Sequence, residues 1–322
     1  MNYPAKIILF GEYGVLLEAQ ALSIPYARFG GNLRVLDESL HHFSEGEQRS
    51  SEELKSMCGF LQNHPEKYRF LQLRLFGEEV QKGLIFDSTI PYGFGLGSSG
   101  ALTAALYDRY VSNSQPLDFL TLKSRLAAME SFFHGTSSGI DPLTSYLKKA
   151  VLFGNNPSVA TAVDLMPFFS SHFLYLLDIP STGHTAELVT KFLHDCEEPS
   201  YRRKIENEYV PIVNQTIAVA ISENCEPLEN CLIKYADFQL THFTGMIPQM
   251  MVKHAKYGLE SGDFYLKLCG SGGGGQMLAI TSHPSRAERY FNLNQLTYTL
   301  IIPDTNLKTN HTTNVPLNSI TS

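Results

Sequence analysis

The pattern of hydrophobic and polar residues predicts strands at the start of the chain and helices after them. From Lys6 to about Val35, β-branched and aromatic residues are interrupted by glycines, which is typical of strands and turns in an antiparallel sheet. Residues 39–55 are polar and predict a surface excursion, whereas Leu84–Thr89 predicts another strand. Helices are expected over Ser98–Val111, where apolar residues recur at helical spacing, and over Asp118–Phe133, with Asp118 as the N-terminal cap.

The second half of the chain predicts a further mixed α/β unit. Helical patterns broken by prolines dominate residues 186–260, and a helix is expected around Ser285–Phe291. The expected strands are Val151–Phe153, Phe173–Ile179, Tyr265–Cys269, Gln276–Thr281 and Leu296–Ile302. After Pro303 the sequence is poor in apolar residues, and we expect a frayed tail.

Length and composition narrow the class of protein. A chain of 322 residues exceeds a typical single domain, so two domains that share a cleft are expected. No apolar run reaches the roughly 18 residues of a membrane span, and a net charge of -7 argues against a nucleic-acid groove, so neither partner is expected. Five scattered cysteines without a C-x-x-C pair and the absence of a secretory leader predict a cytoplasmic location.

The most informative segment is the glycine- and serine-rich stretch Pro91–Ala101, which lies between an expected strand and an expected helix. Glycine allows the backbone to approach a ligand closely, and the unpaired N–H groups of a helix start attract phosphate. The segment is not a Walker loop, because no Gly-Lys-Ser/Thr follows. It therefore predicts an anion site, and the alternative is a mobile loop before a well-capped helix.

This stretch resembles the second motif of the GHMP kinase superfamily, Pro-x-x-x-Gly-Leu-Gly-Ser-Ser-Ala. The resemblance implies nucleotide contacts at the motif positions, with Gly100 in place of the family's alanine; these positions are Gly93, Gly95, Leu96, Gly97, Ser98, Ser99, Gly100 and Ala101. We expect the glycine at position 100 only to loosen the first helical turn, by up to about 1 kcal/mol.

Two further motifs of the superfamily have counterparts in the expected order. Pro4–Tyr13 resembles the first motif, which implies that Lys6 is catalytic and that Glu12 and Tyr13 contact the substrate, although Tyr13 replaces the family's histidine. Lys267–Gly275 resembles the third motif, a glycine loop that would cover the site and present Gly272 and Gly273 to the substrate.

A fourth segment, Glu130–Asp141, resembles the mevalonate kinase signature, with Ser137 where that pattern has proline. The resemblance and the preference of Mg²⁺ for oxygen ligands imply that Ser99 and Glu130 bind the metal and that Asp141, on a loop beside Lys6, acts as the base. His134 is counted with the substrate residues, or it bonds only within its loop. The alternatives are a surface ion pair for Glu130 and a turn before Pro142 for Asp141.

Kinship of fold does not choose a substrate, so the acceptor has to be inferred from local features. Asp178–Thr185 resembles the segment that mevalonate kinases place near the acceptor, which makes Thr182 a candidate contact; capping of the next helix is the alternative. Mevalonate is the expected acceptor. Phosphomevalonate and a sugar are the next candidates, and a non-catalytic binding protein is disfavoured because Lys6, Glu130 and Asp141 are all present.

The resemblance also implies the architecture and the cofactors. It implies an α+β fold with a mixed N-terminal ATP-binding domain over residues 1–165, a ferredoxin-like C-terminal domain over 166–305 and a tail over 306–322, with the active site in the cleft between the domains. ATP and Mg²⁺ are the expected cofactors, and the adenine is expected to contact residues within 57–72. A monomer or a homodimer is expected.

Overall fold

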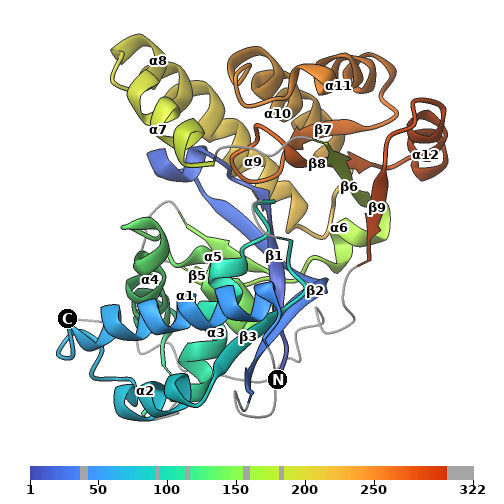
Figure 1. The fold of residues 1–322 in the computed structure, drawn as a ribbon. Helices are drawn as coiled ribbons and strands as arrows, with labels where there is room; N and C mark the ends of the chain where they lie inside the picture. The colour runs from blue at the N-terminus through green and yellow to red at the C-terminus, as the bar shows by residue number, and fades with distance from the viewer. Residues whose placement is uncertain (37–42, 92–93, 113–116, 155–159, 181–184, 303–322) are drawn as a thin grey trace.

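Two antiparallel sheets, built from separate stretches of the chain, form the framework of the molecule (Figure 1). The computed structural model describes residues 1–36, 43–91, 94–112, 117–154, 160–180 and 185–302. The first sheet has the order β1-β2-β4-β5, and β3 also pairs with β2. Its strands are β1 (Tyr3–Phe10), β2 (Ala21–Val35), β3 (Leu84–Ser88), β4 (Val151–Phe153) and β5 (Ala160–Ala162). The strands expected at the start of the chain are thus confirmed.

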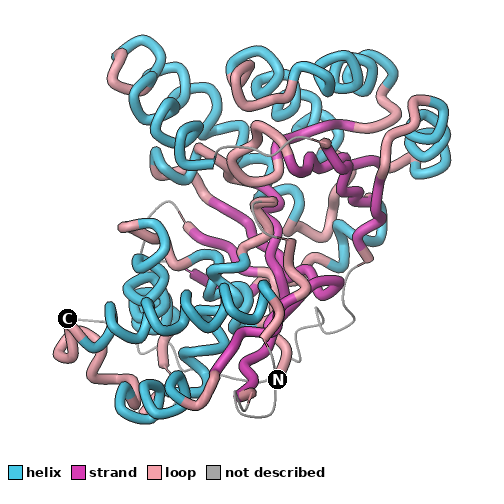
Figure 2. Tube along the Cα trace, in the orientation of Figure 1, coloured by secondary structure: helices cyan, strands magenta, loops and turns pink. Residues whose placement is uncertain are grey.

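Helices pack against the first sheet, and Figure 2 shows them gathered at one end of the molecule. They are α1 (Glu45–Gln62), α2 (Leu73–Gln81), α3 (Ser98–Tyr110), α4 (Phe119–His134) and α5 (Ile140–Leu147), and a 3₁₀ turn, η1 (Gly14–Leu17), follows β1. Helix α3 is buried on nearly every side from Gly100 to Tyr107, so it lies in the interior. Asp118 caps α4 as expected, because its side chain accepts a hydrogen bond from Thr121 N.

The second sheet has the order β7-β8-β6-β9, and every pairing in it is antiparallel. Its strands are β6 (Phe173–Ile179), β7 (Tyr265–Leu268), β8 (Gly275–Thr281) and β9 (Tyr298–Ile301). The helical elements are α6 (Met166–Ser171), α7 (Thr185–Asp195), α8 (Pro199–Lys204), the π-helix η2 (Ile205–Tyr209), α9 (Val210–Ala220), α10 (Leu228–His242), α11 (Gln249–Ser261) and α12 (Pro284–Leu293). The sheet thus follows the β-α-β-β-α-β order of ferredoxin-like units.

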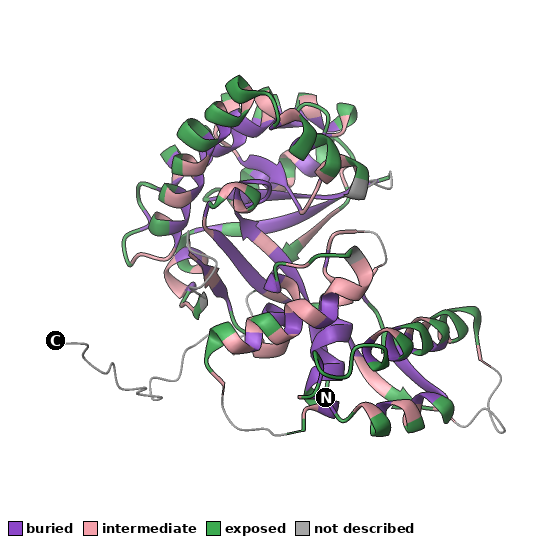
Figure 3. Ribbon diagram, turned by 90° about the vertical axis from the view of Figure 1, so that its left-hand side faces the viewer, coloured by how far each residue is buried: buried purple, intermediate pink, exposed green. Residues whose placement is uncertain are grey.

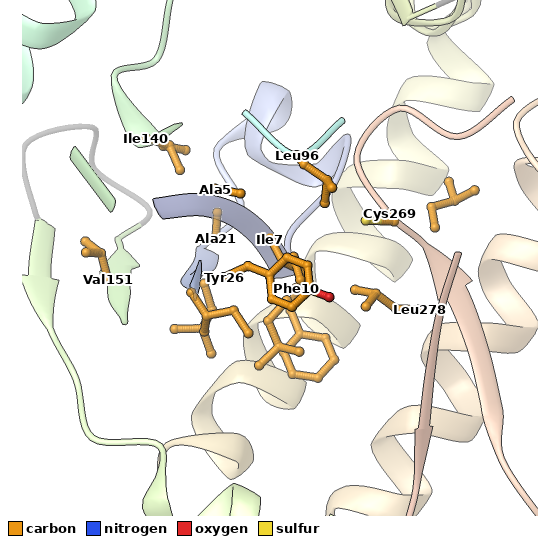
Figure 4. Packing of buried hydrophobic residues seen from close by; sticks show 14 of the residues in the cluster. Ala5, Ile7, Phe10, Ala21, Tyr26, Leu96, Ile140, Val151, Cys269 and Leu278 are labelled. Carbon is orange, nitrogen blue, oxygen red and sulfur yellow. The ribbon is translucent and has the colours of Figure 1, made fainter. Parts of the chain in front are cut away.

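One continuous cluster of buried side chains joins the two sheets. Figure 4 shows Ile7 and Phe10 of β1 near Leu96 of the glycine-rich turn and Leu278 of β8. Figure 3 shows the buried strands enclosed by helices whose outer faces are exposed. The predicted domain boundary after residue 165 falls between β5 and β6, and it stays a prediction. Among the described residues, no helix is long and apolar enough to span a membrane.

The expectation of a polar surface excursion over residues 39–55 is wrong for its second half, because α1 begins at Glu45. Ser44 caps this helix: its hydroxyl accepts from Glu47 N, and the Glu47 carboxylate accepts from Ser44 N. Leu54, Met57 and Leu61 recur at helical spacing and are buried. The overlooked signal is the Ser-x-x-Glu capping box, which marks a helix start even where the first turns are polar.

Candidate active site

A cavity of about 920 Å³ opens between the first sheet, helix α1 and the third glycine loop. Its floor contains Lys6 of β1 and Asp141 of α5, and the glycine-rich turn forms one wall. The turn contributes Gly95, Leu96, Gly97, Ser98 and Ser99 to the lining. Among the described lining residues, Lys6 and Arg49 are the only lysine and arginine.

Gly97 brings the start of α3 directly over the catalytic lysine predicted from sequence. It is the N-cap residue of α3 with a φ of 75°, in the left-handed region that favours glycine. A methyl group on Gly97 would lie 2.7 Å from Cγ of Lys6, and the Lys6 backbone N–H donates to the Leu96 carbonyl at 2.9 Å. The N–H groups of the first turn of α3 and the Lys6 side chain therefore meet in one place, where they favour an anion.

Gly100 lies against the start of α5, a contact that the sequence did not predict. A methyl group at this position would lie 2.8 Å from both the carbonyl carbon and Cβ of Asp141, and 2.9 Å from the Pro142 nitrogen. The expectation that this glycine only loosens a helical turn is therefore wrong. Its missing side chain lets α5 approach α3 closely enough to place Asp141. Gly100 and Ala101 are both buried behind the cavity wall, and Gly93 lies outside the described residues.

Lys6 and Asp141 form an ion pair, with 2.9 Å between Nζ and Oδ2. The Lys6 side chain is 5% exposed and that of Asp141 is 26% exposed, so the carboxylate remains accessible from the cavity. Burial opposes the charge on Lys6, but the charge of Asp141 and its hydrogen bond outweigh burial, and the pKa of Lys6 is raised. Asp141 lies in the first turn of α5 and not on a loop, where the helix dipole favours a carboxylate.

Glu130 reaches the start of α3 from the neighbouring helix α4. Ser99 Oγ donates to Glu130 Oε1 at 3.2 Å, and Ser137 Oγ donates to the other carboxylate oxygen. Burial, and then the charge of Asp141, raise the pKa of Glu130 to about 7. A hydroxyl and a carboxylate beside an anion site are ligands that Mg²⁺ prefers, and a cation there would favour the ionised carboxylate. The donor set thus fits the expected metal.

Glu12 and Tyr13 both contact residues of the third glycine motif. The Glu12 side chain is 1% exposed and pairs with Lys267, while Tyr235 OH donates to its second oxygen at 2.9 Å. Burial raises the pKa of Glu12, although Lys267 opposes this shift. Tyr13 lines the cavity, and its hydroxyl donates to the Ser271 carbonyl at 2.6 Å.

The third glycine loop faces the cavity through residues other than those expected. Gly270 and Ser271 line the cavity, and Gly270 lies against Gly95 of the glycine-rich turn. Gly272 is in contact with the Met246 carbonyl, and Gly273 N donates to the same carbonyl at 2.6 Å. The structure therefore brings the loop to the site but does not place Gly272 and Gly273 in the cavity lining.

The remaining predicted residues are placed only in part. His134 ends α4, but its side chain lies outside the described part of the structure, as does Thr182. Sequence reasoning missed Lys267, which was quoted only as part of a motif, and it missed the contact of Ser137 with Glu130. Neither contact follows from spacing, because each joins separate elements.

Comparison with known proteins agrees with this geometry. Residues 66–149, which carry the glycine-rich turn, Glu130 and Asp141, match the family described as the GHMP kinases N terminal domain. The mevalonate kinase of Thermococcus sibiricus is 26% identical over 303 residues, which cover 86% of this chain and 87% of the relative. This part of the chain therefore matches the N-terminal domain of the GHMP kinases, and the similarity to mevalonate kinases extends over most of the chain. The chain is a phosphotransferase.

Solved structures show the same fold over nearly the whole chain. The Methanococcus jannaschii mevalonate kinase matches with a TM-score of 0.62 at 18% identity, over 93% of this chain and 96% of that chain. The Streptococcus pneumoniae phosphomevalonate kinase in complex with phosphomevalonate and AMPPNP matches with a TM-score of 0.61 at 14% identity, over 94% and 99%. The α+β prediction is confirmed. The two scores are nearly equal, so the fold alone does not select the acceptor.

The cavity extends along α1 and β3, away from Asp141. Its lining there comes from residues 44–53 and 85–91, and none of the residues 57–72 expected to hold adenine belongs to it. Met57 and Leu61 instead face the core. A nucleotide with its phosphates at the start of α3 would therefore have its base beside the first half of α1.

Proposed function

We propose that this protein is a GHMP kinase that transfers the γ-phosphate of ATP to the hydroxyl of mevalonate. The observation that carries the proposal is the Lys6–Asp141 ion pair, 2.9 Å long, at the cavity floor beside the start of α3. A base next to a phosphate site is what phosphoryl transfer to an alcohol requires. The similarity to the Thermococcus sibiricus mevalonate kinase also supports the proposal, because it extends over 86% of this chain.

In this proposal, the start of α3 binds the nucleotide phosphates, and Ser99 and Glu130 bind the metal. The backbone N–H groups of Ser98 and Ser99 hold phosphate oxygens at the start of α3, where the helix dipole also favours negative charge. Ser99 Oγ and the Glu130 carboxylate hold Mg²⁺, which neutralises phosphate charge when bound. Gly95 and Gly270 both line the cavity, where the two glycine loops lie against each other.

Asp141 and Lys6 act on the acceptor. The Asp141 carboxylate accepts the proton of the reacting hydroxyl as the oxygen attacks phosphorus. Lys6 pairs with that carboxylate and stabilises the negative charge that develops on the transferred group. Both are held by rigid elements, β1 and α5, so the reacting hydroxyl has one defined position.

The charge of the cavity favours a small monoanionic acceptor over a phosphorylated one. Arg28 donates to Thr299 and Lys148 lies over the Tyr3 ring, and neither belongs to the cavity lining. Of the two cationic residues in the described lining, Lys6 is already paired with Asp141. A second phosphate would need further cations to compensate its charge. Mevalonate has a single carboxylate and therefore requires fewer cationic side chains in the cavity.

The test is a comparison of kcat/KM for mevalonate, phosphomevalonate, galactose and homoserine at fixed Mg-ATP. We expect mevalonate to be preferred by tenfold or more, which corresponds to about 1.4 kcal/mol in transition-state binding. A tenfold preference for phosphomevalonate or for a sugar would replace mevalonate with that acceptor. Phosphorylation of none of them, by a protein that binds ATP, would contradict the proposed function.

A further inference from the structure

Ser137 connects the two acids of the site. It lies on the short loop between α4, which carries Glu130, and α5, which carries Asp141. Its hydroxyl donates to Glu130 Oε2 and accepts from the backbone N–H of Gly139, at 2.9 Å, just before α5 begins. One side chain therefore ties the carboxylate to the start of the base-bearing helix.

The direction of these hydrogen bonds is fixed by their chemistry. The Gly139 N–H can only donate, so it uses a lone pair of the Ser137 oxygen and leaves the hydroxyl proton for Glu130. Glu130 Oε1 accepts from Ser99 in the same way. Each oxygen of this buried carboxylate thus has one hydroxyl donor, and rotation of the carboxyl group would break both bonds.

Ser137 also departs from the pattern that the segment otherwise resembles, which has proline at this position. Proline carries no hydroxyl, so a protein with proline there has no donor from this residue to the acid. The adjacent Ser138 makes a comparable local bond, because its hydroxyl accepts from Ile140 N at 3.3 Å. Ser138 is exposed and has no hydrogen bond to Glu130 among the described contacts, so the two serines form a natural comparison.

We propose that Ser137 is a positioning residue for the metal site: it holds Glu130 so that Oε1 remains directed at Ser99 and the bound Mg²⁺. The proposal rests on the proposed function for the role of Glu130 as a metal ligand. Residues that orient metal ligands commonly contribute tenfold or more to metal affinity. Loss of the Ser137 hydroxyl frees the carboxylate to rotate and leaves a buried acceptor without a donor.

The test is a Mg²⁺ titration of thermal stability in the presence of a non-hydrolysable ATP analogue, which does not depend on the acceptor or on turnover. Variants are Ser137→Ala, Ser137→Thr, Ser138→Ala and Glu130→Gln. We expect Ser137→Ala to raise the Mg²⁺ concentration for half-maximal stabilisation about tenfold, towards the value of Glu130→Gln. Ser137→Thr, which keeps the hydroxyl, and Ser138→Ala are expected within about twofold of wild type.

Three outcomes would contradict the positioning role of Ser137, and one of them would also contradict the assignment of Glu130 as a metal ligand. A Ser137→Ala protein that matches Ser138→Ala, while Glu130→Gln shifts the titration, would limit Ser137 to a local structural role. A shift in Ser137→Thr as large as in Ser137→Ala would show that the hydroxyl is not the relevant group. A Glu130→Gln titration like wild type would overturn the metal assignment of the proposed function and the positioning role together.

Discussion

Gly97 and Gly100 lie one helical turn apart and are constrained in different ways. Gly97 needs a positive φ and leaves space for Lys6, so both its backbone and its missing side chain matter. Gly100 has ordinary helical geometry, and only its contact with Asp141 and Pro142 excludes a side chain. A glycine in the first turn of a helix can therefore be required by a neighbouring helix even though its own helix would be more stable with alanine.

We expect Gly100→Ala to reduce both stability and turnover. The gain in helix propensity, up to about 1 kcal/mol, is outweighed by overpacking against the backbone of α5, which typically costs about 1–3 kcal/mol. The shift of α5 moves Asp141 away from Lys6. Urea denaturation and kcat would both be measured. Gly59→Ala, at an exposed position of α1 with no atom within 4 Å of the added methyl, is the control and should be neutral or stabilising.

Replacement of Asp141 tests the base directly. Asp141→Asn should lower kcat by about 100-fold or more and leave nucleotide binding nearly unchanged, because the carboxylate acts on the acceptor and not on ATP. Steady-state kinetics and titration with an ATP analogue separate the two effects. Asp164→Asn is the matched control, because Asp164 is exposed, accepts a hydrogen bond from Met166 N and keeps an acceptor oxygen as asparagine. Near-normal turnover in Asp141→Asn would show that another group, such as the γ-phosphate, takes the proton.

At the scale of elements, helix α1 was not predicted from the sequence, yet it contributes several residues to the cavity lining. Its first turns line the cavity and its later turns pack into the core. We therefore expect nucleotide binding to depend on the stability of the first turn of α1. The capping box of Ser44 and Glu47 satisfies backbone N–H groups that the helix itself leaves unpaired.

We expect Ser44→Ala to lower the free energy of unfolding by about 0.5–2 kcal/mol and to raise the KM for ATP, since fraying of the first turn disturbs one wall of the cavity. Chemical denaturation and steady-state kinetics are the measurements. Ser56→Ala, on the exposed face of the same helix, removes only a bond to the Glu52 carbonyl and should change neither quantity. An unchanged KM in a measurably destabilised Ser44→Ala protein would separate the cap from nucleotide binding.

For the whole molecule, a ring of buried hydrogen bonds joins the end of β1 to the end of β7. Glu12 pairs with Lys267, whose Nζ also donates to the Leu268 carbonyl at 2.5 Å. Leu268 N donates to Gln239, and Gln239 donates to Tyr209 at 2.9 Å. Tyr209 OH then donates to the Glu12 carbonyl at 3.1 Å, which closes the ring. The first sheet is thereby fixed to the strand that precedes the third glycine loop.

The two ends of the Glu12–Lys267 ion pair should be energetically coupled. Lys267→Met leaves the Glu12 carboxyl buried without its cation, and we expect a loss of about 3–5 kcal/mol in the free energy of unfolding. The double variant with Glu12→Gln should lose less than the sum of the two single variants, because no buried charge remains. Urea denaturation of the four proteins gives the coupling energy. Strict additivity would mean that the pair does not hold the sheets together.

The strands and most helices were predictable because their side chains repeat with the period of a strand or a helix. Leu84–Ser88 and Ser98–Tyr110 match their predicted ranges to within one residue at each end. The predictions failed where the local signal was polar, as in α1, or where a short helix followed a loop, as for Asp141. In both cases a cap or a neighbouring element, not periodicity, fixes the helix.

The sequence by itself determined the identity of the chemical groups: a glycine-rich helix start, the ion-pairing residues Lys6 and Asp141, and Glu130 with Ser99. Motifs reveal these groups because phosphate binding constrains residues that are close together in the chain. Only the tertiary structure decided that Glu12 pairs with Lys267, that Ser137 donates to Glu130, and that Gly100 must be glycine. Burial and packing across separate elements set these contacts, and neither is encoded in the local pattern of residues.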